Sequence, residues 1–392
     1  MSDWKECTLS DLGTIVGGAT PSTKDSSNYE KGTIAWITPK DLSTHTERFI
    51  SFGERNITEK GLKSCSAQIM PKNSVLFTSR APIGYVAISS NECCTNQGFK
   101  SIVPNENTDF MFLYYLLKFN KDNIENMGSG TTFKEVSGNT MKNIKVKVPA
   151  NKSEQSKIAA VLSSLDEKIE LNNRINDNLE QQAQAIFKSW FVDFEPFDGK
   201  MPEGWRVGKL SEIADIIMGQ SPDGKSYNED GIGTVFYQGR AEFGTRFPTR
   251  RLFTKEPKRI AKKFDTLMSV RAPVGDLNIA NEDCCIGRGL AAIHSKDSHQ
   301  SFIHYTVAFL HPQLDVFNGE GTVFGCINRD ALNNMEVLIP SKPDLDKFEQ
   351  IVAALDNDIF NRTEENRNLV FLRDTLLPKL MSGEIDVNSV QV

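Results

Sequence analysis

Ser-Arg-Ala-Pro-Ile-Gly at residues 79–84 returns as Val-Arg-Ala-Pro-Val-Gly at residues 270–275, 191 positions later. Gly-Ser-Gly-Thr-Thr-Phe at 128–133 returns with the same spacing as Gly-Glu-Gly-Thr-Val-Phe at 319–324. Matches that share one spacing without gaps over a long stretch are typical of an internal repeat. The sequence therefore predicts a tandem duplication.

The two copies differ in length inside a defined segment. Leu-Ser at 9–10 and Pro21 match Leu-Ser at 210–211 and Pro222, 201 positions later. The first copy therefore has ten more residues than the second between Pro21 and Arg80. Copies that agree at both ends of a segment and diverge inside it favour a shared scaffold that carries different loops.

The composition is that of a globular protein with two or three domains in its 392 residues. The sequence has no apolar run of 18 residues and no charged and apolar leader, so we expect no membrane span and a cytoplasmic location. Seven cysteines without a leader favour reduced thiols over a disulfide framework.

A heptad pattern follows each copy. Seam positions step alternately by three and four from Leu162 to Trp190, and a second series runs from Phe348 to Leu380. Asn176 and Asn366 occupy equivalent places in the two seams, as expected if two paired helices need a fixed register. The alternative, in which each helix packs only on its own repeat, stays open at this point.

Each globular repeat reads as a mixed α/β fold with short strands. Apolar or alternating runs at 74–77, 144–148 and 336–339 are bounded by Pro and Gly, as strands are. Helices are expected within 109–125 and 299–316.

The net charge of −6 is unevenly distributed. Residues 238–271 hold ten Arg and Lys against three acidic residues. A local excess of this kind is typical of a surface that faces phosphates.

Two diverged repeats, each with an Arg-Ala-Pro turn, a Gly-x-Gly-Thr-x-Phe loop and a following heptad helix, resemble the specificity subunit of type I restriction-modification enzymes. The stretches at 158–172 and 201–205 also resemble sequence typical of that family. The resemblance covers almost the whole chain.

The resemblance implies an α/β architecture with four parts. These are two target-recognition domains at 1–150 and 196–340, and two helices at 151–195 and 341–392 that pair as an antiparallel coiled coil. Each domain would read one half of a bipartite, asymmetric DNA site in the major groove, and the helices would set the gap.

The resemblance also implies that this chain is not itself an enzyme. Two methyltransferase subunits would dock on it, and motor-nuclease subunits could join them. S-adenosylmethionine would belong to the methyltransferase partners, and ATP and Mg²⁺ to the full restriction complex, with no cofactor or metal in this chain.

Residues shared by both copies suit phosphate contact or loop bracing, whereas base readers should lie where the copies diverge. The predicted DNA-binding residues of the first copy are Thr38, Lys40, Arg80, Gln97, Gly130, Thr131, Thr132 and Lys134. Those of the second copy are Gln238, Arg240, Arg246, Arg250, Arg251, Arg271, Arg288 and Thr322. For the Gly-rich loops, a tight structural turn is an equally weighted alternative.

Other chemistries are weakly supported. The adjacent pairs Cys93-Cys94 and Cys284-Cys285 lack the two-to-four-residue spacing of zinc ligands and suit buried packing. Asp223 with Glu256 and Lys258 formally matches a nuclease spacing of acids and lysine. A protein scaffold that does not touch DNA is the third alternative.

Overall fold

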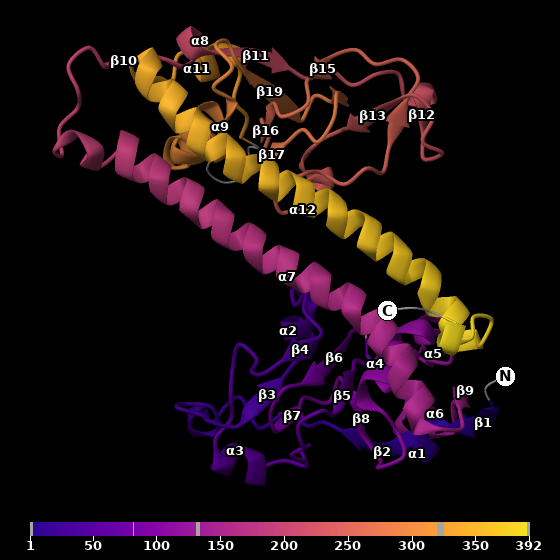
Figure 1. The fold of residues 1–392 in the computed structure, drawn as a ribbon. Helices are drawn as coiled ribbons and strands as arrows, with labels where there is room; N and C mark the ends of the chain where they lie inside the picture. The colour runs from indigo at the N-terminus through magenta and orange to yellow at the C-terminus, as the bar shows by residue number, and fades with distance from the viewer. Residues whose placement is uncertain (1–2, 81, 131–133, 320–324, 390–392) are drawn as a thin grey trace. The chain divides into compact units, whose positions relative to one another are not determined.

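The computed structural model describes residues 3–80, 82–130, 134–319 and 325–389 (Figure 1). The chain folds as two compact units, the first made of Met1–Asn172 with Glu365–Val392 and the second of Asn173–Glu364. Each unit therefore holds one globular repeat together with parts of both long helices. The boundaries expected from the sequence separate each domain from its long helix. The compact units instead divide both helices, α7 after Asn172 and α12 before Glu365.

The first unit begins with β1 and a series of short elements. They are β1 (Trp4–Thr8), α1 (Leu9–Leu12), β2 (Gly13–Gly17), β3 (Ala35–Ile37), α2 (Pro39–Ser43), β4 (Phe49–Ile50), α3 (Glu59–Lys63), β5 (Val75–Phe77), β6 (Val86–Ser89), β7 (Cys93–Thr95), β8 (Lys100–Pro104), α4 (Phe110–Phe119), α5 (Lys121–Asn126), α6 (Gly138–Asn143) and β9 (Lys145–Pro149). The long helix α7 (Lys152–Phe191) follows.

The second unit repeats this order with variations. Its elements are β10 (Arg206–Lys209), α8 (Leu210–Ile213), β11 (Ala214–Met218), β12 (Tyr227–Asn228), β13 (Thr234–Tyr237), β14 (Phe253–Thr254), β15 (Ile260–Ala261), β16 (Thr266–Ser269), β17 (Leu277–Ile279), β18 (Cys284–Ile286), β19 (Leu290–Ser295), α9 (Gln300–Phe309), α10 (His311–Leu314), α11 (Arg329–Asn333) and β20 (Glu336–Ile339). The second long helix is α12 (Lys342–Ser382).

The sheets confirm the duplication. In the first unit the strand orders are β2-β8-β5-β6-β4, β1-β9 and β3-β7, and in the second they are β11-β19-β16-β17, β10-β20 and β12-β14-β13-β18-β15. The β3-β7 and β13-β18 pairs are parallel in both copies. The predicted mixed α/β fold, with two repeats that are each followed by a long helix, is confirmed.

Most of the extra length of the first copy lies in one place. The backbone N–H of Ile88 donates to the carbonyl of Arg48, and that of Ile279 donates to the carbonyl of Arg246, both at 2.8 Å. These bonds make Arg48 and Arg246 equivalent although they are 198 positions apart rather than 191. Seven of the ten extra residues therefore follow Arg48, in the stretch that holds α3.

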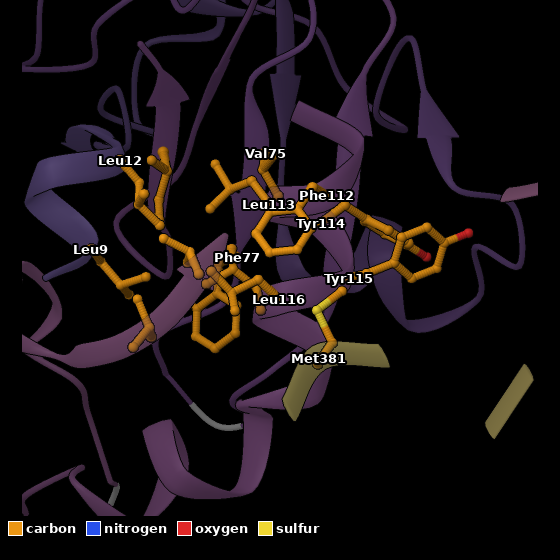
Figure 2. Packing of buried hydrophobic residues seen from close by; sticks show 14 of the residues in the cluster. Leu9, Leu12, Val75, Phe77, Phe112, Leu113, Tyr114, Tyr115, Leu116 and Met381 are labelled. Atoms are coloured by element: carbon orange, nitrogen blue, oxygen red, sulfur yellow. The ribbon is translucent and has the colours of Figure 1, made fainter. Parts of the chain in front are cut away.

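The core of the first unit lies between its main sheet and α4, which contacts β5 and β6 (Figure 1). Phe112, Leu113 and Tyr115 of α4 are fully buried, because this helix is apolar on nearly every face. Figure 2 shows Met381 of α12 beside Tyr115 and Leu116 in the same cluster. The C-terminal part of the chain therefore completes the first unit.

Each globular repeat is tied to a long helix by the same tyrosine–aspartate hydrogen bond, which is buried in the first unit and partly buried in the second. The hydroxyl of Tyr115 donates to Asp166 at 2.6 Å in the first unit, and the hydroxyl of Tyr305 donates to Asp356 at 2.9 Å in the second. The second link therefore lies 190 positions after the first. A different arginine completes each link, Arg373 at 2.7 Å from Asp166 in the first unit, and Arg246 beside Asp356 in the second.

Within each unit the segments of α7 and α12 run antiparallel. In the first unit Arg373 contacts Asp166, and the amide of buried Asn172 donates to Asn366 at 2.9 Å, so positions on α12 fall as those on α7 rise. In the second unit the same order holds, because Asn176 contacts Thr363 whereas Phe187 and Phe191 pack on Phe348. The helices thus pack on each other as well as on their own repeats.

Of the two expected register residues, Asn366 accepts the amide of Asn172, and Asn176 donates to Thr363 at 3.4 Å. Each asparagine thus contacts the other helix, but the two asparagines do not pair with each other.

Among the helices in the described ranges, none has the length and apolar character needed to span a membrane.

We expect Phe348→Ala to lower the free energy of unfolding of the second unit by about 3–5 kcal/mol, because the substitution leaves a cavity against Phe187 and Phe191. Ile351→Ala is the control in the part of α12 that belongs to the same unit. Ile351 is 45% exposed, so a change of at most about 1 kcal/mol is expected. Urea unfolding followed by the fluorescence of Trp190, which touches Phe348, measures both. An equal loss of unfolding free energy in the two variants would contradict the packing of Phe348 against Phe187 and Phe191.

Candidate nucleic-acid interface

Three of the repeated motifs lie side by side in the first unit. The backbone N–H of Ser79 donates to the carbonyl of Gly98 at 2.7 Å, and the N–H of Val136 donates to the carbonyl of Ser79 at 2.9 Å. Arg80 and Glu135 form an antiparallel bridge next to this bond. The Arg-Ala-Pro turn therefore lies between the segment after the cysteine pair and the segment after the Gly-rich loop.

The second unit repeats this arrangement bond for bond. The N–H of Val270 donates to the carbonyl of Gly289 at 2.9 Å, and the N–H of Ile327 donates to the carbonyl of Val270 at 3.1 Å. Arg271 forms the equivalent bridge with Cys326. Motifs that are far apart in the sequence thus form one framework in each copy.

The predicted residues of this framework are only partly covered by the described ranges. Arg80 and Arg271 are both exposed, and Arg80 forms an ion pair with Glu135 at 3.0 Å. Gly130 and Lys134 are also exposed. Thr131, Thr132 and Thr322 lie outside the described residues.

Gln97 and Arg288 lie next to equivalent hydroxyl residues, Thr20 and Ser221, in the two copies. The hydroxyl of Thr20 donates to the side chain of Gln97, and the backbone N–H of Arg288 donates to the hydroxyl of Ser221 at 3.3 Å. Both side chains are exposed beside the framework. The two residues, which align in the sequence, therefore occupy the same place in the two units.

The parallel strand pairs make the predicted base readers of the two copies equivalent. Ile37 of β3 pairs with Thr95, and Tyr237 of β13 pairs with Ile286. Thr38 directly follows β3 and Gln238 directly follows β13, so Lys40 and Arg240 also occupy matching positions. The two copies thus offer different polar side chains at one structural location.

In the first copy these side chains already have protein partners. The hydroxyl of Thr38 donates to Asp41 at 2.6 Å at the start of α2. Lys40 forms an ion pair with Glu54 at 2.6 Å, and both side chains are more than 60% exposed. An exposed pair of this kind contributes only about 0–1 kcal/mol, so a ligand can displace it.

The arginines of the second copy are also paired, mainly with acids that are distant in sequence. Gln238 is exposed. The ion pairs join Arg240 to Asp276, Arg250 to Glu282, and Arg251 to Glu242 at 2.9 Å. The surface formed by residues 238–271 therefore carries less net positive charge than the composition of this stretch indicates.

Arg246 differs from the other predicted DNA-binding residues because it faces inward. Its side chain is 10% exposed and pairs with Glu180 of α7 and Asp356 of α12, and it also donates to the hydroxyl of Tyr305 at 3.1 Å. A guanidinium held by two carboxylates in a buried position serves packing within the second unit. We therefore leave Arg246 out of the proposed DNA contacts.

The equivalent residue Arg48, which the sequence did not single out, has the same structural role in the first unit. Its side chain is 5% exposed and contacts Glu170 of α7 at 2.9 Å and the hydroxyl of Ser163 at 2.5 Å. Burial disfavours the charged form of Glu170, but the hydrogen bonds from Arg48 outweigh it and hold the pKa of this carboxyl below its usual value. The bonds at Ile88 and Ile279 reveal the equivalence, which the sequence spacing does not.

The cysteine pairs lie on β7 and β18 and are buried. Cys93 and Cys94 belong to two different apolar clusters, as expected for neighbouring residues of a strand. Burial raises the pKa of Cys93 to about 11 and that of Cys94 to about 12. Both therefore serve as packing thiols.

The residues of the nuclease alternative have separate local roles. The side chain of Asp223 accepts the backbone N–H of Lys225 at 2.9 Å and so caps a short turn, and Glu256 and Lys258 are exposed. Within the described ranges, no group of three His, Cys, Asp or Glu side chains could hold a metal ion.

Comparison with known proteins gives one consistent result. The family model described as "Type I restriction modification DNA specificity domain" matches residues 1–181 and 202–368. The MjaIX specificity subunit of a type I restriction enzyme from Methanocaldococcus jannaschii is 35% identical, with 99% of this chain and 95% of that protein covered. The HindI specificity subunit of Haemophilus influenzae is 25% identical, with 98% of this chain and all of that protein covered.

A solved structure supports the fold. The crystal structure of the S subunit of a type I restriction-modification system from M. genitalium matches with a TM-score of 0.65 and 18% identity, over 97% of this chain and 96% of that one. At this identity the match concerns the fold alone.

We expect Arg48→Met to destabilise the first unit by about 3–5 kcal/mol, because Glu170 would stay buried without its cation. Lys40→Met removes a cation from an exposed pair and should cost at most about 1 kcal/mol. Urea unfolding at pH 7 compares the two variants.

Acid unfolding gives a second measurement. The pKa of Glu170 is lowered in the folded protein, so its stabilisation is complete above the unfolded value of about 4.3 and is lost as the pH falls through the folded value. In Arg48→Met this contribution should disappear. A variant as stable and as acid-sensitive as the parent protein would show that the buried pair does not hold the unit together.

Proposed function

Since the chain belongs to the type I restriction-modification DNA specificity family, we propose that each of its repeats reads one half of a bipartite, asymmetric DNA site in the major groove. The resemblance read from the sequence is confirmed by these matches, and with it the expectation of a specificity subunit, which is a non-catalytic component. One observation carries the bipartite proposal, namely that a common framework presents different side chains at equivalent positions after β3 and β13.

We assign base reading to the segments where the copies differ. In the second copy Gln238, Arg240, Arg250 and Arg251 are exposed at or after the end of β13. Arginine suits guanine and glutamine suits adenine, and each good bidentate pair gives about 1–3 kcal/mol of discrimination. In the first copy Thr38 and Lys40 occupy the matching place. The two half-sites would therefore differ in sequence.

The carboxylates that pair with these cations fit the same proposal. Glu54 and Asp276 lie beside Lys40 and Arg240, and a carboxylate can accept a hydrogen bond from the amino group of cytosine. Exposed ion pairs also keep the cations from binding any polyanion indiscriminately, because an incoming phosphate must first displace the acid.

We assign phosphate contact to the framework. Residues shared by both copies cannot by themselves distinguish two different half-sites, so they suit the contacts that fix position. The shared candidates are Arg80, Gly130, Thr131, Arg271 and Thr322, and Thr132 and Lys134 follow Thr131 in the first copy. Gln97 and Arg288 are aligned between the copies but chemically different, so they can also contribute to a difference between the half-sites. Gly130 has a backbone φ of +130°, a conformation that glycine adopts readily.

The helices are proposed to set the gap between the half-sites and to dock two methyltransferase subunits. In support of docking, α7 and α12 carry exposed large apolar side chains in both units. These are Leu171, Ile351, Phe371 and Leu372. A duplicated body with two similar surfaces suits two copies of one partner. S-adenosylmethionine would be bound by those partners, ATP and Mg²⁺ by motor-nuclease subunits where present, and the assembly would act in the cytoplasm.

Methylome sequencing tests the proposal directly. Cells that express this chain with its methyltransferase partner should show a two-part motif with a fixed gap, and exchange of residues 196–340 for the corresponding domain of another family member should alter one half only. The unexchanged chain is the control. A contiguous motif would contradict the bipartite reading, and a lack of sequence-dependent methylation would favour a scaffold that does not read DNA.

Point variants test the base readers. Arg240→Ala should relax the motif in the half read by the second repeat, by about 1–3 kcal/mol of discrimination at one base pair. Lys40→Ala, at the equivalent position of the first copy, should alter only the other half. If both variants leave the methylated motif unchanged, the segments after β3 and β13 are not the reading segments.

A further inference from the structure

The two copies of the Arg-Ala-Pro turn have different electrostatic surroundings. In the first copy Arg80 contacts Glu135 at 3.0 Å, and the same carboxylate lies 3.7 Å from Lys100. Glu135 is about one third exposed, so its charge also reaches the surface. Glu135 therefore neutralises Arg80, the arginine that both copies of the framework share.

The second copy lacks this acid. Cys326 takes the place of Glu135 in the bridge to Arg271, and fully buried Ala291 takes the place of Lys100. Arg271 is exposed, and among the described residues no carboxylate forms an ion pair with it. The arginine at this position is thus paired with a carboxylate in the first copy, as Arg80, and can bind an anion in the second, as Arg271.

A second arginine adds to this difference. Arg288 lies next to Gly289, whose carbonyl accepts the hydrogen bond from Val270, so the backbone of Arg288 lies close to that of Arg271. In the part of the chain that the structure describes, the Arg288 side chain also has no acidic partner. The first copy has an uncharged Gln97 at this place, and its side chain already accepts the hydroxyl of Thr20.

We propose that Arg271 and Arg288 form a phosphate-binding site for the DNA backbone in the second repeat, and that Glu135 weakens the corresponding site at Arg80 in the first. The two repeats would then bind the duplex with unequal strength, the second repeat providing the tighter anchor. This inference rests on the proposed function, because it requires both repeats to bind DNA.

Two physical effects favour the second repeat. An arginine without a carboxylate partner binds a phosphate and releases a counterion without first breaking an ion pair. In the first repeat an approaching phosphate meets the negative charge of Glu135 and must displace it from Arg80. Each repeat has an arginine at the shared position, so its pairing differs because Glu135 of the first repeat is replaced by Cys326 in the second.

Reciprocal substitutions test this difference in the full-length chain. Binding of a fluorescent DNA duplex of mixed sequence is measured by anisotropy over a range of salt concentrations. Glu135→Cys should tighten binding about three- to fivefold at low salt and steepen the dependence of log K on log salt by about 0.9, the value for one added phosphate contact. Cys326→Glu and Arg271→Gln should weaken binding by a similar factor and reduce the slope.

The matched control is Glu203→Gln, which removes one exposed carboxylate from a segment outside the framework. It should change affinity far less than Glu135→Cys, although both raise the net charge by one. Circular dichroism of each variant establishes that it is folded.

The outcomes separate the inference from the function on which it rests. A parent protein that binds the duplex in a salt-dependent way, with reciprocal variants no different from Glu203→Gln, would overturn the unequal anchors and leave the specificity role intact. A parent protein that shows no salt-dependent binding would overturn both.

Discussion

The hydrogen bond between a tyrosine of each globular repeat and an aspartate of a long helix is the interaction on which the rest of each unit depends. Asp166 is buried and the side chain of Asp356 is only 18% exposed, and a carboxylate largely removed from water is tolerated only when charge and hydrogen bonds compensate it. The tyrosine supplies a hydroxyl donor and an arginine supplies the charge. In the first unit this arginine comes from α12, and in the second it comes from the diverged segment of the repeat itself. The tyrosine–aspartate bond that both units share therefore fixes the helix against the repeat. The arginine that pairs with the aspartate comes from a different place in each unit.

Much of the architecture could be predicted because it depends on local pattern. The strand at 336–339 and the helices within 109–125 and 299–316 were expected from apolar periodicity, and they occur as β20, α4 with α5, and α9 with α10. The shared spacing of the motifs predicted the duplication, and the heptads predicted two long helices. These features are set by residues close to one another in the chain, where periodicity carries the information.

The electrostatics of the candidate site could not be predicted in the same way. The stretch at 238–271 was judged by the charges inside it, but Arg240 and Arg250 are neutralised by Asp276 and Glu282, which arrive through the fold of the second repeat. Arg246 looked like its neighbours in the sequence, yet it faces inward to Glu180 and Asp356, more than 60 residues away on either side. Its counterpart Arg48 was missed because the copies differ in length around it. The backbone hydrogen bonds from Ile88 and Ile279 show that the two arginines are equivalent.

The division of both long helices between the units has a consequence for synthesis of the chain. Leu380, Met381 and Val387 belong to the buried core of the first unit, although the whole second repeat precedes them in the chain. A nascent chain that leaves the ribosome must therefore hold its first repeat with an incomplete core until the second repeat and α12 have been translated. During that interval, the apolar surface around Tyr115 and Leu116 is open to chaperones and to other nascent chains. Closure of the first unit by residues 380–387 would then report that the second repeat has been translated.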